Sequence, residues 1–592
     1  MAKLLTRIGR TLALLTPWLL GITPISHADT PAFNTRFTAI AFHDVAARLS
    51  DIPAEQRADA VSTEKLIAFF DWLQAEGWRA ISLDDIEAAN AGVRPLPERS
   101  VLITVDDGYQ SVYTHFYPLA LAYRIPIVAA VHTAWLEETR PEALVRYGES
   151  MVPRQRFLNW PQMREMQASG WIEFASHTHA MQSGELMAPQ GSTAPAAVTR
   201  SWSTDTGHES PEAHLQRLVS DLRRSRDILT RELGHPPRAL AWPFGAHTAE
   251  GRKAAHLAGF RMLFTLDPEP SDTSDLMAIS RFLPASDPRL GEMIEAMRFQ
   301  DPLPAARRLV CMDPSQLLSS ARAASPEEAI EEMLGATIDR MAALGVTHVV
   351  LPALTTDGRA WFPNEVGVPW NHVLPRLARQ LRTRAGVQVV IRMPVSEALA
   401  AAGGDRDKAL ALYRDLGAFV RPDALWFDQR DGAATWVDHQ ASRPDDERMP
   451  WQVRRDRDRL ALANFDDAAT LSLQAWRAVQ ASQATLALIW LTDPTATRSA
   501  PLADLTLVPT SSGQAIDWRA PAPPGSSSES RRIGLWWSSP TPQRADTLIA
   551  AFRRMASDGG TVFGWCPDGV SGSPEQQSRL KAELGTNAWL ED

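Results

Sequence analysis

Short apolar runs alternate with amphipathic stretches along most of this chain. Between about residues 36 and 290 the runs have the length and composition of strands that are buried on both faces. They predict strands at Phe37–Phe42, Val101–Val105, Ile125–Val131, Trp171–Ala175, Ala239–Trp242 and Met262–Leu266. Stretches with capping residues at their ends predict helices over 63–76, 160–169 and 212–232. Repeated strand–helix units predict an α/β domain with a parallel sheet, either open or closed as a barrel.

The same rhythm restarts after a boundary near residues 290–307. Strands are predicted at Leu309–Met312, Thr347–Leu351, Val387–Arg392, Ala424–Phe427, Thr485–Leu491, Leu505–Val508, Ile533–Trp537 and Thr561–Trp565. Helices are predicted over 326–344, 371–385, 405–416, 464–482 and 541–558. Strands and helices in this number and order predict a (β/α)8 barrel of the TIM type as a second domain.

The amino terminus has the pattern of an export signal. Lys3, Arg7 and Arg10 precede an apolar core over 12–22, and small residues at 26 and 28 suit a signal peptidase. The core is too short to span a bilayer, and no cysteine lies nearby to accept a lipid. We therefore expect a signal peptide over 1–28, a first domain over 29–300 and a second over 301–592, with the mature protein soluble in the periplasm.

Composition narrows the class of ligand. The net charge of -10 and the lack of Lys/Arg runs argue against nucleic acid. The chain has 20 Trp and only 6 Tyr, a balance that mildly favours glycan binding. Its two cysteines, Cys311 and Cys566, fall on the first and last predicted barrel strands, so a single bridge and two buried thiols are both open. Residues 183–210 are predicted as a long surface loop, and residues 519–530 as a flexible insertion.

The first candidate for chemistry is Asp106-Asp107-Gly108, directly after the strand at 101–105. Two adjacent carboxylates at the end of a buried strand repel each other, and burial raises the free-energy cost of ionising them. A bound cation would hold one carboxylate as a ligand and leave the other as a general base toward water. The alternative is a plain Asp-Asp-Gly turn before a capped helix.

Three more polar clusters follow predicted strands. They are His43-Asp44, the Ser176–His179 stretch and Trp242–Gly245. Because carboxyl ends of parallel strands meet on one face, Asp106, Asp107, His43 and His177 are expected to converge there. Histidines and aspartates at matching strand ends favour a metal site over isolated structural histidines.

These segments resemble a known family. Thr104 to Gly108 (TVDDG) resembles the first motif of polysaccharide deacetylases, carbohydrate esterase family four. The wider set resembles the poly-β-1,6-N-acetyl-D-glucosamine N-deacetylases of biofilm export systems, which carry a second, glycoside-hydrolase-like barrel. That set comprises segments 42–45, 157–160, 176–178, 241–245 and 263–266, with looser matches at 357–363, 381–386, 393–394 and 564–568.

The resemblance implies a metal-dependent removal of acetyl groups from N-acetylglucosamine residues. It implies Asp106 as general base, Asp107 and His177 as ligands of a divalent metal, zinc first with cobalt or nickel as alternatives, and His43 as an acid or positioning residue. Where the family has its third ligand, this chain has Gln182. His179 is expected to replace it, because residues i and i+2 of an extended segment face the same side; Gln182 itself is the alternative.

The remaining assignments concern substrate and partners. The resemblance implies polymer contacts from Trp242 and Phe244 in the first domain and from Asp428 and Asp431 in the second, and an outer-membrane export porin as partner of a monomer. Asp313, Asp428, Asp431 and Asp568 are candidates for glycosidase carboxylates, but no pair of them is singled out. Two other hypotheses stay open: a glycan-binding protein with a decayed metal site, and a glycosidase acting through the second barrel.

Overall fold

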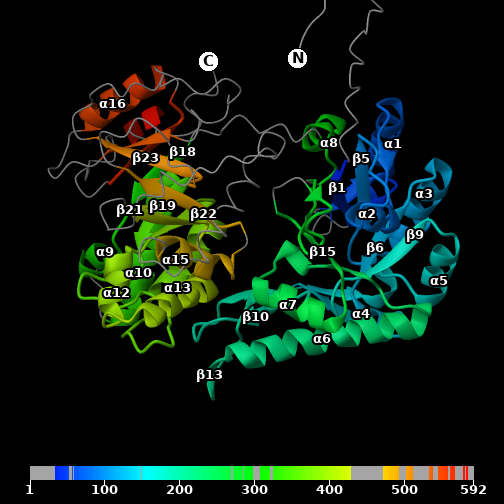
Figure 1. Ribbon diagram of the computed structural model, residues 1–592, viewed down its shortest axis with the longest axis horizontal. Coiled ribbons are helices and arrows are strands. Elements are labelled where there is room, and N and C mark those ends of the chain that lie inside the picture. Colours follow the sequence, from blue (N-terminus) through cyan, green and yellow to red (C-terminus); the bar gives the residue numbers. More distant parts are fainter. Residues whose placement is uncertain are drawn as a thin grey trace, which may run out of the picture.

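The computed structural model shows two α/β domains side by side (Figure 1). It describes residues 34–584 except 53–56, 58, 149, 268–270, 285, 298–306, 321–324, 429–470, 484, 493–501, 511–532, 538–544, 558–559, 567–577 and 580–581. The predicted signal peptide and the predicted insertion at 519–530 therefore lie outside the described residues. No helix within these ranges is long and apolar enough to cross a membrane.

The first domain is built on a nine-stranded sheet with the order β16-β1-β5-β6-β9-β14-β15-β17, and β4 pairs with β5. Its strands are β1 (Arg36–Phe42), β4 (Arg79–Ala80), β5 (Ser100–Val105), β6 (Ile127–Val131), β9 (Ile172–Ser176), β14 (Ala239–Ala241), β15 (Met262–Thr265), β16 (Ser271–Asp272) and β17 (Ile279–Ser280). Phe282, just after β17, exchanges backbone hydrogen bonds with Ala39 and Ala41 of β1. The sheet therefore curls back on itself as a barrel-like structure, which is one of the two arrangements that the sequence left open.

Alternating side chains along the central strands separate two cores. On β6, Ile127, Ala129 and Val131 face the larger cluster toward the helices, whereas Val128 and Ala130 face the interior cluster. Because both faces are buried, these strands are continuous apolar runs. This is why the sequence located them within one or two residues.

Helices and short strand pairs surround the sheet. The helices are α1 (Thr63–Ala75), α2 (Leu83–Asn90), α3 (Tyr117–Tyr123), α4 (Thr133–Glu137), α5 (Trp160–Ala168), α6 (Pro211–Leu233), α7 (Ala249–Ala258) and α8 (Leu290–Met297). The small strand pairs are β2 (Asp44–Ala46) with β3 (Ala60–Ser62), and β7 (Leu144–Tyr147) with β8 (Ser150–Pro153). Asn159 caps α5 and Ser210 caps α6 through side-chain oxygens, in agreement with the predicted helix starts.

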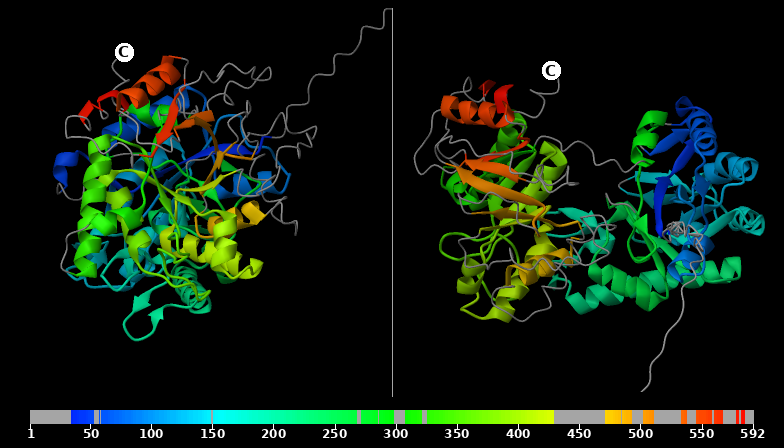
Figure 2. Two further views of the ribbon diagram at one scale, coloured as in Figure 1. Left: turned by 90° about the vertical axis from the view of Figure 1, so that its left-hand side faces the viewer. Right: turned by 45° about the horizontal axis from the view of Figure 1, so that its top comes forward.

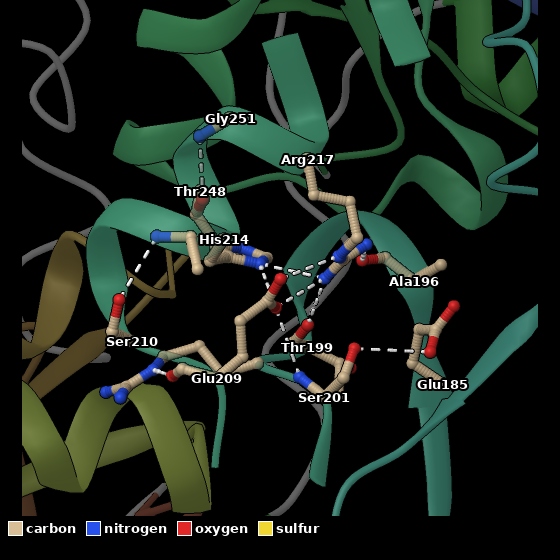
Figure 3. Close-up of polar contacts among 12 residues, drawn as sticks. Glu185, Ala196, Thr199, Ser201, Glu209, Ser210, His214, Arg217, Thr248 and Gly251 are labelled. Atoms are coloured by element: carbon tan, nitrogen blue, oxygen red, sulfur yellow. Dashed lines mark hydrogen bonds and ion pairs between the residues drawn. The ribbon is translucent and has the colours of Figure 1, made fainter. Parts of the chain in front are cut away.

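The segment 183–210 is more ordered than predicted. It contains two hairpins, β10 (Gly184–Leu186) with β11 (Thr193–Pro195) and β12 (Trp202–Ser203) with β13 (Gly207–His208). Arg217 of α6 holds the segment by donating hydrogen bonds to Glu209 and to the carbonyls of Ala196 and Thr199 (Figure 3). These contacts come from a helix outside the segment, so the composition of the segment does not reveal them.

The same segment contacts the second domain. The guanidinium of Arg200 pairs with Glu365 and lies over the ring of Phe419, whose ring is also 4.7 Å from that of His208. Figures 1 and 2 show β10 and β13 on the side of the first domain that faces the second. The segment therefore lies at the domain interface.

The second domain is a closed parallel barrel, which confirms the predicted architecture. Its strands are β18 (Arg307–Cys311), β19 (His348–Pro352), β20 (Gln388–Arg392), β21 (Ala424–Asp428), β22 (Ala487–Leu491), β23 (Leu505–Thr510), β24 (Ile533–Trp537) and β25 (Val562–Trp565). Its described helices are α9 (Pro314–Ser320), α10 (Pro326–Leu344), α11 (Val373–Gln380), α12 (Val395–Ala401), α13 (Arg406–Val420), α15 (Leu471–Gln480) and α16 (Ala545–Ser557).

A disulfide joins the first and last barrel strands. Cys311 and Cys566 are bridged, so of the two alternatives that the sequence left open the structure shows the bond. Since β18 pairs with β25, the bridge lies at the seam where the barrel closes.

Candidate active site

The site lies at the carboxyl ends of β1, β5, β6 and β9. The backbone ladder continues past two of these strands, because the N–H of Asp106 donates to Phe42 O and that of His177 to Val131 O, both at 2.8 Å. Asp106, Asp107 and His177 are therefore carried to the same edge of the sheet, together with His43 after β1. Asp106, Asp107 and His177 are each at most 2% exposed.

Asp106 forms a buried ion pair with Arg281. The two terminal nitrogens of Arg281 donate to the two carboxylate oxygens of Asp106, each at 2.8 Å, and one of them also donates to the hydroxyl of Thr104 at 2.9 Å. Burial alone would raise the pKa of Asp106, but the charges of Arg281 and His177 and the hydrogen bonds outweigh it and lower the pKa to about 2. Asp106 is therefore a fixed anion at neutral pH.

Arg281 is a site residue that the sequence did not predict. It follows β17, which has only two residues and no apolar run of its own, so strand prediction does not point to it. Its geometry is set by the backbone, since its N–H donates to the carbonyl of Thr265 at 3.1 Å.

Asp107 lies against His177 and Tyr147. Its Oδ1 is 3.3 Å from His177 Nε2, and its Oδ2 accepts a hydrogen bond of 2.8 Å from the Tyr147 hydroxyl. Asp107 has a φ of 68°, and the next residue, Gly108, has a φ of 71°. A Cβ on Gly108 would lie 2.9 Å from a methyl carbon of Val131, so only glycine fits this close approach of β5 to β6.

The tautomer of His177 is fixed from behind. Its Nδ1 lies 3.0 Å from the carbonyl oxygen of Ala241, so this nitrogen carries the proton and Nε2 of the neutral ring directs a lone pair at Asp107. Burial lowers the pKa of His177, but the hydrogen bond that a protonated Nε2 gives to Asp107 and the charges of both aspartates outweigh it, and the pKa is raised. Either a proton or a cation must therefore separate the two acceptors.

Asp107 and His177 fit two positions of a metal centre. Ligand bonds to zinc of about 2.0–2.2 Å at tetrahedral angles separate two ligand atoms by about 3.4 Å, close to the 3.3 Å between Oδ1 and Nε2. Apart from its contact with His177, Oδ1 of Asp107 has no hydrogen-bond partner among the described residues. However, within the described ranges no three His, Cys, Asp or Glu side chains already form a complete set for a metal.

The extended backbone from which His179 was expected to replace the third ligand is not found. Thr178 between the two histidines has a φ of 69°, so the segment is not extended and the alternation of side chains fails. The ring of His179 lies 3.1 Å from the hydroxyl of Thr133, and its backbone N–H donates to Asp221. Gln182 is 7% exposed, and its Oε1 has no partner in the described part of the chain.

His43 directly follows β1, the strand that pairs with β5. Its charge is among the influences that lower the pKa of Asp106, which places its ring close to that carboxylate. The Nδ1 of His43 is buried and has no hydrogen-bond partner among the residues described.

The aromatic pair Trp242 and Phe244 divides into a core residue and a surface residue. Trp242 is completely buried in the cluster formed by α6, α7 and β14, so it offers no surface to a substrate, and its predicted role in binding polymer is corrected. Phe244 is 51% exposed and has a φ of 60°. It remains a candidate contact.

The second barrel gives fewer candidates. Asp428 ends β21, and Asp313 accepts a hydrogen bond from the backbone N–H of Ser315 at 2.8 Å. Asp431 and Asp568 lie outside the described residues. The tryptophans near the strand ends are at most 5% exposed and form core rather than a binding surface; they are Trp361, Trp426, Trp490, Trp537 and Trp565.

Comparisons with known proteins agree with this site. Residues 93–263 match the family described as polysaccharide deacetylase. A poly-beta-1,6-N-acetyl-D-glucosamine N-deacetylase of Escherichia coli strain K12 is 31% identical over 379 residues, which are 62% of this chain and 54% of that protein. A protein of the same name from Staphylococcus aureus strain MRSA252 is 21% identical over 208 residues, 35% of this chain and 61% of that protein.

Among solved structures, the BpsB deacetylase domain of Bordetella bronchiseptica is 35% identical, with 42% of this chain and 95% of that chain covered at a TM-score of 0.38. The chain spans about half the length of the Escherichia coli relative that it matches. The family match includes Asp106, Asp107 and His177, the residues that the fold brings together. The chain therefore contains a polysaccharide deacetylase domain.

Proposed function

We propose that this protein removes acetyl groups from poly-β-1,6-N-acetyl-D-glucosamine in a metal-dependent hydrolysis. The observation that carries the proposal is the pairing of a fixed anion, Asp106, with the adjacent acceptors Asp107 and His177 at one sheet edge. The names of the relatives from two genera support the choice of substrate.

Asp107 and His177 would hold the cation, with zinc as the first choice and cobalt or nickel as alternatives. When bound, such a cation polarises the amide carbonyl and lowers the pKa of water. Tyr147 and the carbonyl of Ala241 orient the two ligands from behind, through Oδ2 of Asp107 and Nδ1 of His177.

Asp106 accepts the proton of the attacking water. Arg281 donates one hydrogen bond to each oxygen of Asp106, and this bidentate pair fixes the carboxylate plane and keeps the group ionised. A carboxylate with a pKa of about 2 is a weak base. Its contribution therefore depends on holding the water in place and on the acidity that this water acquires in the site.

The leaving amine needs a proton, and His43 is the residue placed to supply it. It follows β1 directly, beside β5 and Asp106, so one histidine and one aspartate flank the reacting bond from neighbouring strands. Phe244 is proposed to contact the sugar. Its ring is half exposed, and it lies just after β14, the strand whose Ala241 carbonyl bonds to His177.

The setting of the reaction is part of the proposal. A signal peptide over 1–28 would deliver the enzyme to the periplasm, where a polymer and an outer-membrane export porin are its partners and where the second barrel binds polymer, with Asp428 and Asp431 as candidate contacts. The bond between Cys311 and Cys566 supports an oxidising compartment.

The test is acetate release from β-1,6-linked N-acetylglucosamine oligomers. We expect chelation to abolish release and zinc, cobalt or nickel to restore it, and we expect Asp107→Ala and His177→Ala to stay inactive with metal present. Oligomer binding without acetate or bound metal would show instead a glycan-binding protein. Chain shortening without acetate would show a glycosidase.

A further inference from the structure

His132 is a buried histidine between the two residues assigned to the metal. It directly follows β6, the strand between β5, which carries Asp107, and β9, which carries His177. It is 4% exposed, and neither ring nitrogen has a hydrogen-bond partner among the described residues. A buried imidazole without any partner loses its hydration with no compensation, so a ligand for it is expected.

The backbone places His132 beside His177. The ladder between β6 and β9 runs on past both strands: His177 N–H donates to Val131 O at 2.8 Å, and Thr133 N–H donates to Thr178 O at 3.2 Å. Neighbouring strands lie about 4.8 Å apart, so two imidazoles at facing positions reach one cation between them.

The side-chain direction agrees with this register. Val128 and Ala130 of β6 face the interior of the barrel, and His132 continues their alternation; Ala175 and His177 have the same relation on β9. The ring of His132 packs on Trp135 at 4.1 Å, and Trp135 packs on Tyr147 at 5.4 Å. Tyr147 in turn binds Asp107, which closes the ring of contacts around the site.

We propose that His132 supplies the third protein ligand of the metal held by Asp107 and His177. The proposal rests on the proposed metal-dependent function. One carboxylate and two imidazoles with an open position are a donor set of catalytic zinc sites. Since no three described acidic or histidine side chains already form a complete set, His132 must turn about its side-chain bonds when metal binds.

His132 is a better ligand for this metal than His179 and Gln182, the two candidates that the sequence suggested. His179 is engaged with the Thr133 hydroxyl and its backbone is held by Asp221. Gln182 also has an unpartnered oxygen, but an amide oxygen suits magnesium or calcium better than zinc, whereas imidazole suits zinc.

The test is X-ray absorption at the zinc edge on the full mature chain loaded with one equivalent of zinc. We expect two imidazole ligands in the wild type and in the control His179→Ala, and one in His132→Phe, which keeps a ring against Trp135. Chelator competition should show zinc affinity at least about 100-fold weaker in His132→Phe, since removing even an outer partner of a ligand costs 10–100-fold.

Each outcome decides the inference. One imidazole in the wild type, or two in His132→Phe, would overturn it and leave the proposed function intact if Asp107→Ala still loses zinc. A wild type that binds no zinc, cobalt or nickel would overturn the metal-dependent function as well. If His132→Phe fails to fold, the imidazole count of the wild type with that of His179→Ala still decides.

Discussion

Replacing Arg281 by Met should destabilise the first domain through a charge that it leaves behind. Asp106 is 2% exposed, and Arg281 donates to both of its oxygens. Removing one partner of a buried ion pair leaves an uncompensated charge and costs about 3–5 kcal/mol. We therefore expect Arg281→Met to lower the free energy of unfolding of the metal-free protein by about that amount at pH 7.

The pKa of Asp106 gives a second value for the contribution of this ion pair to the free energy of unfolding. Pairing with Arg281 and His177 outweighs burial and lowers this pKa from 3.8 to about 2. Each unit corresponds to about 1.4 kcal/mol, so the ionised group contributes about 2 kcal/mol at neutral pH. Because the folded pKa lies below the unfolded one, this contribution is present above about pH 4 and is lost as the pH falls toward 2.

In Arg281→Met the sign reverses, because burial then dominates and raises the pKa of Asp106 above its unfolded value. The difference in stability between wild type and variant should therefore be largest at pH 7 and shrink as the pH falls toward 4. Urea unfolding in chelator at both pH values measures it. Arg140→Met is the control, because the exposed pair of Arg140 with Glu138 should contribute nothing measurable.

A loss below about 1 kcal/mol in Arg281→Met would refute this reasoning. So would a loss of equal size at pH 7 and pH 4, since it would mean that Asp106 does not titrate against Arg281.

Two further predictions concern Tyr147 and the disulfide. Tyr147→Phe removes the hydroxyl that donates a hydrogen bond to Asp107 Oδ2. Chelator competition should then show a metal affinity weaker by about 10–100-fold, with the thermal unfolding curve unchanged. Equal metal affinity in the variant and the wild type would exclude this orienting role of Tyr147. The double replacement Cys311→Ser with Cys566→Ser opens a loop of 255 residues. In the chain-entropy model, closing such a loop stabilises the folded barrel by about 5 kcal/mol. Calorimetry should therefore show the barrel melting at a lower temperature while the first domain melts as before. An unchanged barrel transition would contradict it.

The sequence could locate the site because strand ends were readable. Apolar runs buried on both faces marked β1, β5 and β9 within one or two residues, and His43, Asp106 and His177 follow those runs directly. Parallel strands then bring these ends together without any further information. The same rule applied to the run at 125–131 points to His132, which sequence reasoning did not consider.

Other features depend on backbone geometry that no local pattern records. The positive φ of Thr178 breaks the extended geometry between His177 and His179, although their spacing suits an extended segment. Arg281 reaches Asp106 across 175 positions from a strand of two residues, so neither length nor periodicity signals it. Trp242 follows a strand as the site residues do, yet its bulk packs into the core against Gly251.

The central claim is that amide hydrolysis depends on the carboxylate of Asp106. The most direct test is acetate release from β-1,6-linked N-acetylglucosamine oligomers by metal-loaded Asp106→Asn, beside Asp313→Asn as a matched change at a strand end of the second barrel. We expect the first variant to fold, to retain metal and to release no acetate, and the second to release acetate at the wild-type rate. Undiminished release by Asp106→Asn, or loss of release only in Asp313→Asn, would contradict the account.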